Sequence, residues 1–133
     1  MRRLLLVLAL SLGLAVPQVA VTRPAIASVD DCPRGYVCLF RDRDTQGWEH
    51  FQLSVWSSYG DLRMAPCYIC KNGDWNDDMS SWVNNSGIRY CWYFDSYFRG
   101  SGSRGPRPMP YQFGRIVNVT SFENDQASSI GPC

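Results

Sequence analysis

Two short polar runs share one pattern, in which two adjacent Asn or Asp residues are followed, after two intervening positions, by a pair of serines. The first is NDDMSS at residues 76–81, and the second is NDQASS at residues 124–129. One such run is typical of a turn, because Asn, Asp and Ser side chains hydrogen-bond to nearby backbone. Two matching runs, here named the first and second hexad, indicate a shared task, and loops rich in hard oxygen ligands suit Ca²⁺.

The cysteines are the second group of residues that could do chemistry. Cys67 and Cys70 have the spacing of a redox-active pair, but that chemistry needs the start of a helix in a βαβ unit, and the surrounding sequence shows no helix periodicity. An even number of cysteines in an exported chain predicts three structural disulfides, with fifteen possible pairings. The six are Cys32, Cys38, Cys67, Cys70, Cys91 and Cys133.

The N-terminal residues have the pattern of a secretory signal. Two arginines precede a mainly apolar run over residues 4–16, and a small-x-small cleavage site, Ala-Ile-Ala, follows at residues 25–27. The apolar run is too short to span a bilayer. We therefore expect residues 1–27 to be removed as a signal peptide. Residues 28–133 are then expected to be secreted as one extracellular, monomeric domain without a membrane span.

The exported chain is expected to be close to neutral. The whole sequence has 13 Lys and Arg and 12 Asp and Glu residues, and residues 1–27 contain three of the arginines and no acidic residue, which leaves ten basic side chains. Nucleic-acid binding usually needs a concentrated basic face, and the local excess is limited to a few arginines between residues 99 and 115. We expect no nucleic-acid partner.

The pattern after residue 28 is that of an all-β protein. Short β-branched and aromatic runs alternate with clusters of Gly, Asn, Asp and Ser, and amphipathic helix periodicity is hard to find. In the best strand candidates every second side chain could face a core. These candidates are residues 35–40, 49–56, 88–94 and 115–122.

The chain also contains an internal repeat. CLFRDRDTQG at residues 38–47 aligns without gaps with CWYFDSYFRG at residues 91–100, at an offset of 53, whereas the hexads lie 48 residues apart. The first copy therefore holds five additional residues between its glycine and its hexad. The repeat places both hexads at equivalent positions of a duplicated unit, which spans about residues 35–85 and 88–131.

These residues resemble the βγ-crystallin superfamily, whose Greek-key unit opens with an aromatic, four residues, a second aromatic, one residue and glycine. Tyr93, Phe98 and Gly100 match that signature in full. In the first copy Thr45 stands at the second aromatic position, so a less well-packed corner is expected there. The resemblance implies two Greek-key motifs that form one β-sandwich, stapled by the disulfides.

The resemblance also implies a calcium role for the hexads. Calcium-binding members of the superfamily carry an Asn/Asp-Asn/Asp-x-x-Ser/Thr-Ser loop in each unit, and each ion is held by both loops. Carried over, this implies up to two calcium ions with a dissociation constant on the order of 10⁻⁴ M. The alternative is that the hexads serve turn geometry only. The implied metal ligands are Asn76, Asp77, Asp78, Ser80, Asn124, Asp125, Gln126 and Ser128, with Asp78 and Gln126 contributing main-chain oxygen.

The entry CPRGYVCLF, at residues 32–40, looks more specifically like small exported bacterial proteins of this fold assigned to a family of metalloproteinase inhibitors. Membership would imply an extracellular protease as the partner. MAPCYICKNG, residues 64–73, lies in the region where the first repeat is longer than the second. Insertions of this kind on a rigid scaffold often carry function. A loop pinned by a disulfide loses little entropy on docking and could lay an extended backbone across a protease cleft. The implied inhibitory loop comprises Pro66, Cys67, Tyr68, Ile69 and Cys70.

Two alternatives remain beside this loop. One is a plain surface turn at residues 66–70. The other is the Gly- and Pro-rich connection at residues 100–110, which carries Arg104 and Arg107 and would suit a trypsin-like target, although an unpinned arginine loop is more often a substrate.

Catalysis is not expected. His50 is the only histidine and lies in a strand-like alternation, and the sequence has neither an HExxH motif nor a nucleophile elbow. The carboxylates of Asp42 and Asp95 occupy equivalent repeat positions, which favours a structural role. Two hypotheses follow: an exported peptidase inhibitor, or a non-inhibitory calcium-binding module with a structural or cell-surface role.

Overall fold

The computed structural model describes residues 29–45 and 49–133. The expected signal peptide, its cleavage site and Gly47 lie outside this part of the chain. Within the described ranges no helix is long and apolar enough to cross a membrane.

The described chain is built from short strands joined by turns and single-turn 3₁₀ helices, and it contains no α-helix. This confirms the all-β prediction, and each of the four predicted strand segments contains an observed strand. The strands are β1 (Tyr36–Phe40), β2 (His50–Ser54), β3 (Ser81–Asn84), β4 (Tyr90–Tyr93), β5 (Arg107–Met109), β6 (Ile116–Asn118) and β7 (Ser129–Pro132). The 3₁₀ helices are η1 (Val29–Asp31), η2 (Arg43–Thr45), η3 (Leu62–Met64) and η4 (Gly102–Arg104).

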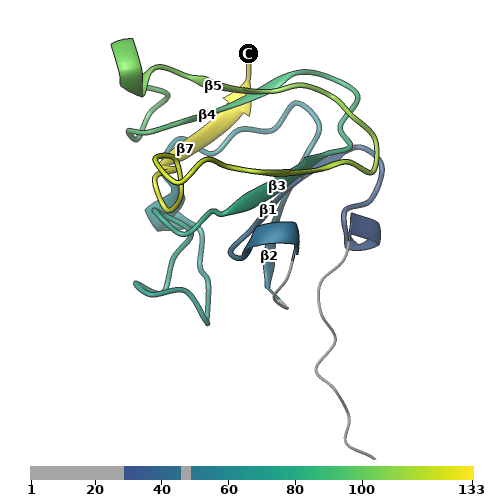
Figure 1. Ribbon diagram of the computed structural model, residues 1–133, viewed down its shortest axis with the longest axis horizontal. Helices are drawn as coiled ribbons and strands as arrows, with labels where there is room; N and C mark the ends of the chain where they lie inside the picture. The colour runs from purple at the N-terminus through teal and green to yellow at the C-terminus, as the bar shows by residue number, and fades with distance from the viewer. Residues whose placement is uncertain (1–28, 46–48) are drawn as a thin grey trace, which may run out of the picture.

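The strands form two antiparallel sheets that lie as two layers (Figure 1). One has the order β2-β1-β3-β6 and the other the order β5-β4-β7. Each sheet is formed mainly by one half of the chain and is completed by one segment from the other half. Strand β6 pairs with β3, and in return Tyr59 forms a bridge with Ile130 in β7. This exchange is what locks two Greek-key motifs into one sandwich.

The core forms where period-two alternation points apolar side chains between the layers. In β1, Val37 and Leu39 enter the main cluster, whereas Cys38 and Phe40 point to the opposite face and join a second, smaller cluster. Both faces of β1 are therefore covered, which explains its continuous apolar run. The main cluster also contains the buried rings of Trp75, Trp82, Tyr90, Trp92 and Phe94.

All six cysteines are paired in the structure, as the even count predicted. The sequence left the pairing open, and the structure joins Cys32 to Cys38, Cys67 to Cys70 and Cys91 to Cys133. Two bonds close short loops of sequence separation 6 and 3, and the third spans 42 residues and ties β4 to the end of the chain.

Candidate functional site

The two hexads lie against each other and are joined by reciprocal main-chain hydrogen bonds. The Asp77 N–H donates to the Ala127 carbonyl at 3.0 Å, and the Asp125 N–H donates to the Met79 carbonyl at 3.1 Å. Asp77 and Asp125 both adopt left-handed backbone, with φ of 57° and 54°. Asp tolerates this conformation better than most residues. The duplicated sequence has therefore folded into a pair of loops with matching local geometry.

The last serine of each hexad closes the folded corner of its own repeat. In the second copy, the Ser129 hydroxyl accepts from Phe98 N–H at 3.0 Å and donates to the Asp95 carbonyl at 2.8 Å. In the first copy, Ser81 accepts from Thr45 N–H at 3.3 Å and donates to the carbonyl of the residue equivalent to Asp95, at 2.6 Å. These two serines therefore have a structural role, because their hydroxyl groups hold the corners closed.

The two corners share a backbone conformation although their side chains differ. Asp44 and Thr45 have positive φ, as do the equivalent Tyr97 and Phe98. In the second corner the rings of Tyr93 and Phe98 pack edge to face with centroids 5.7 Å apart. Thr45 cannot provide that ring contact, but it is only 2% exposed.

The first serine of each hexad lies close to the aspartate of the opposite loop. The Ser128 hydroxyl donates to Asp77 Oδ1 at 3.5 Å. In the matching arrangement, a hydrogen bond from Ser80 to Asp125 opposes the rise in the pKa of that carboxyl that desolvation causes. Each hydroxyl thus approaches a carboxylate supplied by the other hexad. A cation that took both groups as ligands would be held by both loops at once.

Desolvation raises the pKa of both aspartates above the ordinary value. For Asp77 this effect is opposed by hydrogen bonds from Asn76 and Ser128. For Asp125 the negative charge of Asp78 adds to the rise, and hydrogen bonds from Asn124 and Ser80 oppose it. The asparagine that precedes each aspartate thus donates to its carboxylate, at 2.7 Å for Asn76. Partly desolvated carboxylates favour a bound cation, because the cation compensates the buried negative charge.

The remaining side chains of the hexads are engaged elsewhere. The buried Asp78 carboxylate accepts from Lys71 N–H at 2.9 Å, and the Gln126 amide donates to the Asp125 carbonyl at 2.9 Å. Main-chain oxygen is therefore what these two residues could offer an ion, as the resemblance implied. In the described ranges, no three or more His, Cys, Asp or Glu side chains form a group that could hold a metal ion by themselves. Besides the Asp77 or Asp125 carboxylate, an ion here would depend on hydroxyl, amide and main-chain oxygens, which suits weak Ca²⁺ binding better than a transition metal.

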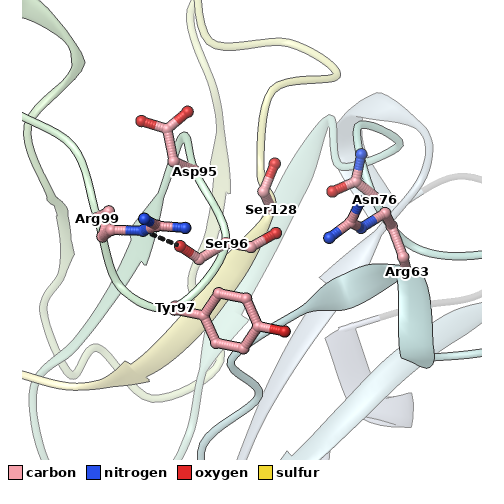
Figure 2. A pocket seen from close by; sticks show the side chains of 7 residues that line it. All are labelled: Arg63, Asn76, Asp95, Ser96, Tyr97, Arg99 and Ser128. Atoms are coloured by element: carbon pink, nitrogen blue, oxygen red, sulfur yellow. Dashed lines mark hydrogen bonds between the residues drawn. The ribbon is translucent and has the colours of Figure 1, made fainter.

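A surface pocket of ≈ 470 Å³, lined by residues with polar groups, borders the first hexad. Arg99 and Arg63 lie on opposite sides of it in Figure 2, with Ser96 and Ser128 between them. Arg63 is paired with Asp61, and its hydrogen bonds lower the pKa of that carboxyl to about 2. Sequence analysis did not predict this pocket, because its lining comes from segments separated by up to 65 positions, and no local pattern marks them. The full lining is Arg63, Asn76, Asp95, Ser96, Tyr97, Arg99 and Ser128.

The predicted inhibitory loop is a tight turn closed by the Cys67–Cys70 disulfide. Its base is fixed by the Pro66–Asp74 bridge and by the Cys67 N–H, which donates to the Gly73 carbonyl at 3.0 Å. Both cysteines are buried, whereas Tyr68 is 94% exposed and Ile69 is 40% exposed. The segment between η3 and β3 projects away from the two layers (Figure 1). The loop forms turns and bends rather than the extended backbone expected for a strand laid across a cleft.

The competing arginine loop is not a free projection. The guanidinium groups of Arg104 and Arg107 lie 4.7 and 4.9 Å from the ring centroid of Phe94. Arg107 also donates to the Glu123 carboxylate and to the Ser103 carbonyl. These contacts hold Arg107 partly buried. Arg104 and Arg107 are therefore held against Phe94, whereas the Tyr68 side chain is exposed at the tip of its loop.

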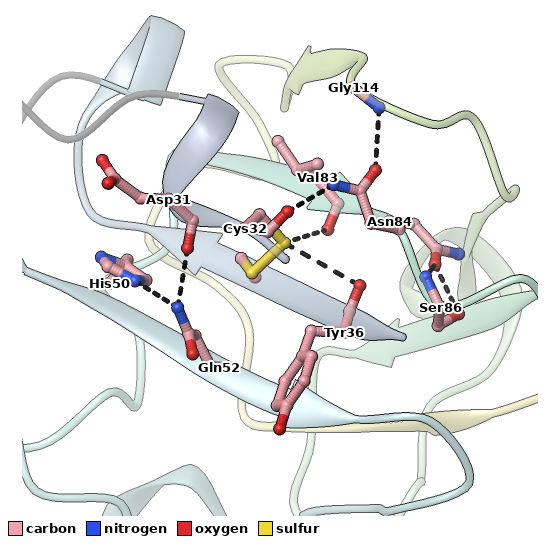
Figure 3. Close-up of a disulfide and its surroundings, with 11 residues drawn as sticks. Asp31, Cys32, Tyr36, His50, Gln52, Val83, Asn84, Ser86 and Gly114 are labelled. Carbon is pink, nitrogen blue, oxygen red and sulfur yellow. Dashed lines mark hydrogen bonds between the residues drawn. A yellow bond between two sulfur atoms is a disulfide. The ribbon is translucent and has the colours of Figure 1, made fainter. Parts of the chain in front are cut away.

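The one histidine lies beside the N-terminal disulfide and shows no catalytic arrangement. Its ring stacks on Phe40 with centroids 5.5 Å apart, and its Nε2 lies 2.7 Å from the amide nitrogen of Gln52, which also donates to the Asp31 carbonyl (Figure 3). The buried Nδ1 has no hydrogen-bond partner among the described residues. Among the described residues, no carboxylate therefore accepts a proton from the ring Nδ1, as a catalytic triad would require.

The fold places the protein in a known structural class, the βγ-crystallin-type β-sandwich. One solved structure, from work on the evolution of the eye lens βγ-crystallin domain fold, is 19% identical with a TM-score of 0.56, over 77% of this chain and 89% of its own. A βγ-crystallin from Ciona intestinalis is 22% identical with a TM-score of 0.52, over 74% of this chain and 100% of its own. No curated protein sequence matches the chain.

The chain belongs to peptidase inhibitor family I36, whose family model matches residues 25–104. This match covers the first repeat and the Cys67–Cys70 loop and ends before the second hexad. It identifies the protein as a peptidase inhibitor and not an enzyme, and it implies a protease as the partner.

Proposed function

We propose that the protein is an exported inhibitor of metalloproteases that blocks the active-site cleft with the Cys67–Cys70 loop. Export is inferred from residues 1–27 and agrees with the three disulfides, which persist in oxidising surroundings. The observation that carries the proposal is the exposure of Tyr68 on a covalently closed turn. An aromatic ring on a rigid support can fill an apolar subsite with little loss of conformational entropy.

The choice of a metalloprotease rests on the resemblance and on the loop side chains. Tyr68 and Ile69 are bulky and mainly apolar, which suits proteases that prefer such residues beside the scissile bond of their substrates. Neither residue is basic, so a trypsin-like specificity pocket would gain no ion pair from them.

The test is a titration of the purified, disulfide-bonded protein against a thermolysin-type metalloprotease, with trypsin-type and subtilisin-type enzymes as controls. We expect loss of metalloprotease activity at near one-to-one stoichiometry, with the inhibitor recovered uncut. Ile69→Asp should abolish inhibition, because a carboxylate would have to be desolvated in an apolar subsite. Met64→Asp, at an exposed residue outside the loop, is the matched control. Full activity of all three enzymes at micromolar protein would disprove the proposal.

A second function, calcium binding by the hexads, is favoured by the cross-loop approach of Ser128 to Asp77 and of Ser80 to Asp125. We propose up to two weak sites of this kind, with a dissociation constant on the order of 10⁻⁴ M. Calcium would then stabilise the sandwich or a cell-surface contact whether or not the loop inhibits a protease.

Calorimetric titration with Ca²⁺ tests this second function. Replacing Ser80 and Ser128 together with alanine should lower the affinity, while inhibition by the Cys67–Cys70 loop persists. Ser121→Ala, at an exposed turn position, should leave calcium binding unchanged. No heat of binding and no rise in melting temperature at 10 mM Ca²⁺, roughly a hundred times the expected dissociation constant, would show that the hexads serve turn geometry only.

A further inference from the structure

Three charged side chains outside the inhibitory loop hold its main-chain polar groups. We propose that Arg41, Glu49 and Asp78, here called the loop clamp, are positioning residues that turn the polar backbone of the loop inward. The protease is then recognised through the side chains of Tyr68 and Ile69. This inference rests on the proposed function, because it assigns the geometry by which that loop acts.

Glu49 binds the tip of the loop through both carboxylate oxygens. Its Oε1 accepts from Tyr68 N–H at 3.1 Å, and its Oε2 accepts from Ile69 N–H at 3.2 Å. Hydrogen bonds to an ionised acceptor are about twice as strong as neutral ones. Two consecutive amides directed at one carboxylate also fix the orientation of the peptide plane between them. The donors that an extended inhibitor strand would offer to a protease are therefore already used inside the molecule.

Arg41 and Asp78 hold the other side of the turn. Arg41 Nη1 donates to the Ile69 carbonyl at 2.7 Å, and its Nε lies 3.8 Å from Asp78 Oδ1. The second oxygen of Asp78 accepts from Lys71 N–H at 2.9 Å. The clamp thus occupies the amides of two loop residues, the carbonyl of Ile69 and the amide of Lys71, which directly follows the loop. The positive charge of Arg41 also partly neutralises the two carboxylates, which limits the desolvation cost of holding the three groups near the loop.

The sheet explains why residues so distant in sequence meet at the loop. In the β1–β2 ladder Phe40 pairs with His50, so Arg41 and Glu49 leave the two strands at the same end of the sheet. Asp78 lies in the first hexad, three residues before β3, which pairs with the other side of β1. All three clamp residues therefore extend from one rigid set of neighbouring strands. A support of this kind can fix the position of the loop to within a fraction of an ångström.

This geometry predicts how the loop meets its target. With its main chain bound inward, the loop exposes the ring of Tyr68 and part of Ile69. Recognition by strand addition would require breaking the Glu49 hydrogen bonds, whereas side-chain insertion leaves them intact. A clamped loop also samples few conformations in which a scissile bond could enter the catalytic position. The clamp should therefore support both affinity and resistance to cleavage.

The test uses the full disulfide-bonded protein and compares Glu49→Ala with Glu49→Gln, which retains one acceptor oxygen. Hydrogen exchange of the Tyr68 and Ile69 amides is measured first, because it reports on the clamp without a protease. We expect protected amides in the wild type, loss of protection in Glu49→Ala and partial protection in Glu49→Gln. Free exchange of both amides in the wild type would overturn the clamp itself.

Inhibition of the thermolysin-type protease and cleavage of the loop are then measured on the same proteins. Glu49→Ala should raise the inhibition constant roughly ten- to hundred-fold, as expected for two lost charge-assisted bonds. It should also make the loop cleavable while the two sheets stay folded, and Glu49→Gln should restore part of both properties. Arg41→Met should act in the same direction, with Arg115→Met, at an exposed arginine, as its control.

The outcomes separate this inference from the proposed function. If the wild type does not inhibit although its amides are protected and Glu49→Ala releases them, the inhibitory function fails and the clamp stands as a structural device. If Glu49→Ala releases the amides but inhibits as well as the wild type, the positioning role is wrong. Unchanged inhibition by Tyr68→Ala would overturn recognition through the side chains.

Discussion

The two serines that end the second hexad are adjacent in sequence but have different partners, and their alanine variants should behave differently. Ser129 is fully buried and connects Phe98 N–H to the Asp95 carbonyl, at 3.0 and 2.8 Å. Ser129→Ala leaves both groups without this partner. A buried polar group that loses its hydrogen bond costs about 1–3 kcal/mol. Because this corner is partly open to solvent, we expect about 2 kcal/mol for the two groups together.

Ser128→Ala is the matched variant. Its hydroxyl makes a single bond of 3.5 Å to Asp77, at the limit of useful geometry. We expect a loss of less than about 0.5 kcal/mol without calcium. Urea unfolding in calcium-free buffer, followed by tryptophan fluorescence, measures both changes as a shift in midpoint at constant slope. The melting temperature of Ser129→Ala should fall by about 10 °C. An equal or larger loss in Ser128→Ala would refute this division of tasks.

Three further changes test other parts of the structure. Gly100→Ala should prevent the folded corner from closing, because the added Cβ would lie 2.1 Å from a main-chain oxygen of η4 and φ is 143°; we expect a loss of more than about 2 kcal/mol in urea unfolding. Asp61→Asn should make the free energy of unfolding less dependent on pH between about 4 and 2. Arg63 lowers the pKa of Asp61 to about 2, so the wild type loses the stabilisation from this ion pair only as the pH falls through that range. Replacing Cys91 and Cys133 with serine should cost about 2–5 kcal/mol, and a melting temperature equal to that of the wild type would contradict a stabilising role for this bond.

The fold was predictable because the strongest signals in the sequence are local. The alternation in residues 35–40 and the repeated corner each depend on residues within one short segment, and the structure places β1 and both corners there. Strands β5 and β7 gave weaker signals, since they are short and contain proline or glycine. The pairing of the cysteines depends on how segments meet in space, so composition could give only their number.

The position of the inhibitory loop was predictable from local sequence, but the residues that hold the loop were not. Tyr68 and Ile69 could be located because the disulfide-bonded insertion is a local feature, and their exposure agrees with a contact surface. The residues that hold them are 19 to 28 positions away in the case of Glu49 and Arg41. Their approach follows from the β1–β2 register and from the Cys67–Cys70 turn together. A single sequence carries no pattern for such a three-dimensional coincidence.

Asp78 connects the two proposed functions within one segment. Its carboxylate accepts from Lys71 N–H, directly after the inhibitory loop, and its negative charge contributes to the raised pKa of Asp125 in the second hexad. Arg41 also acts at both places: it donates to the Ile69 carbonyl, and its positive charge opposes the rise in the pKa of Asp125 that desolvation causes. A calcium ion beside Asp125 would therefore attract the same carboxylate that secures the loop and repel the same guanidinium group. Within the described part of the chain, Asp77 and Ser128 make no hydrogen bond to the loop, so a change there should alter calcium affinity alone, whereas Asp78→Asn should alter both calcium affinity and the strength of inhibition.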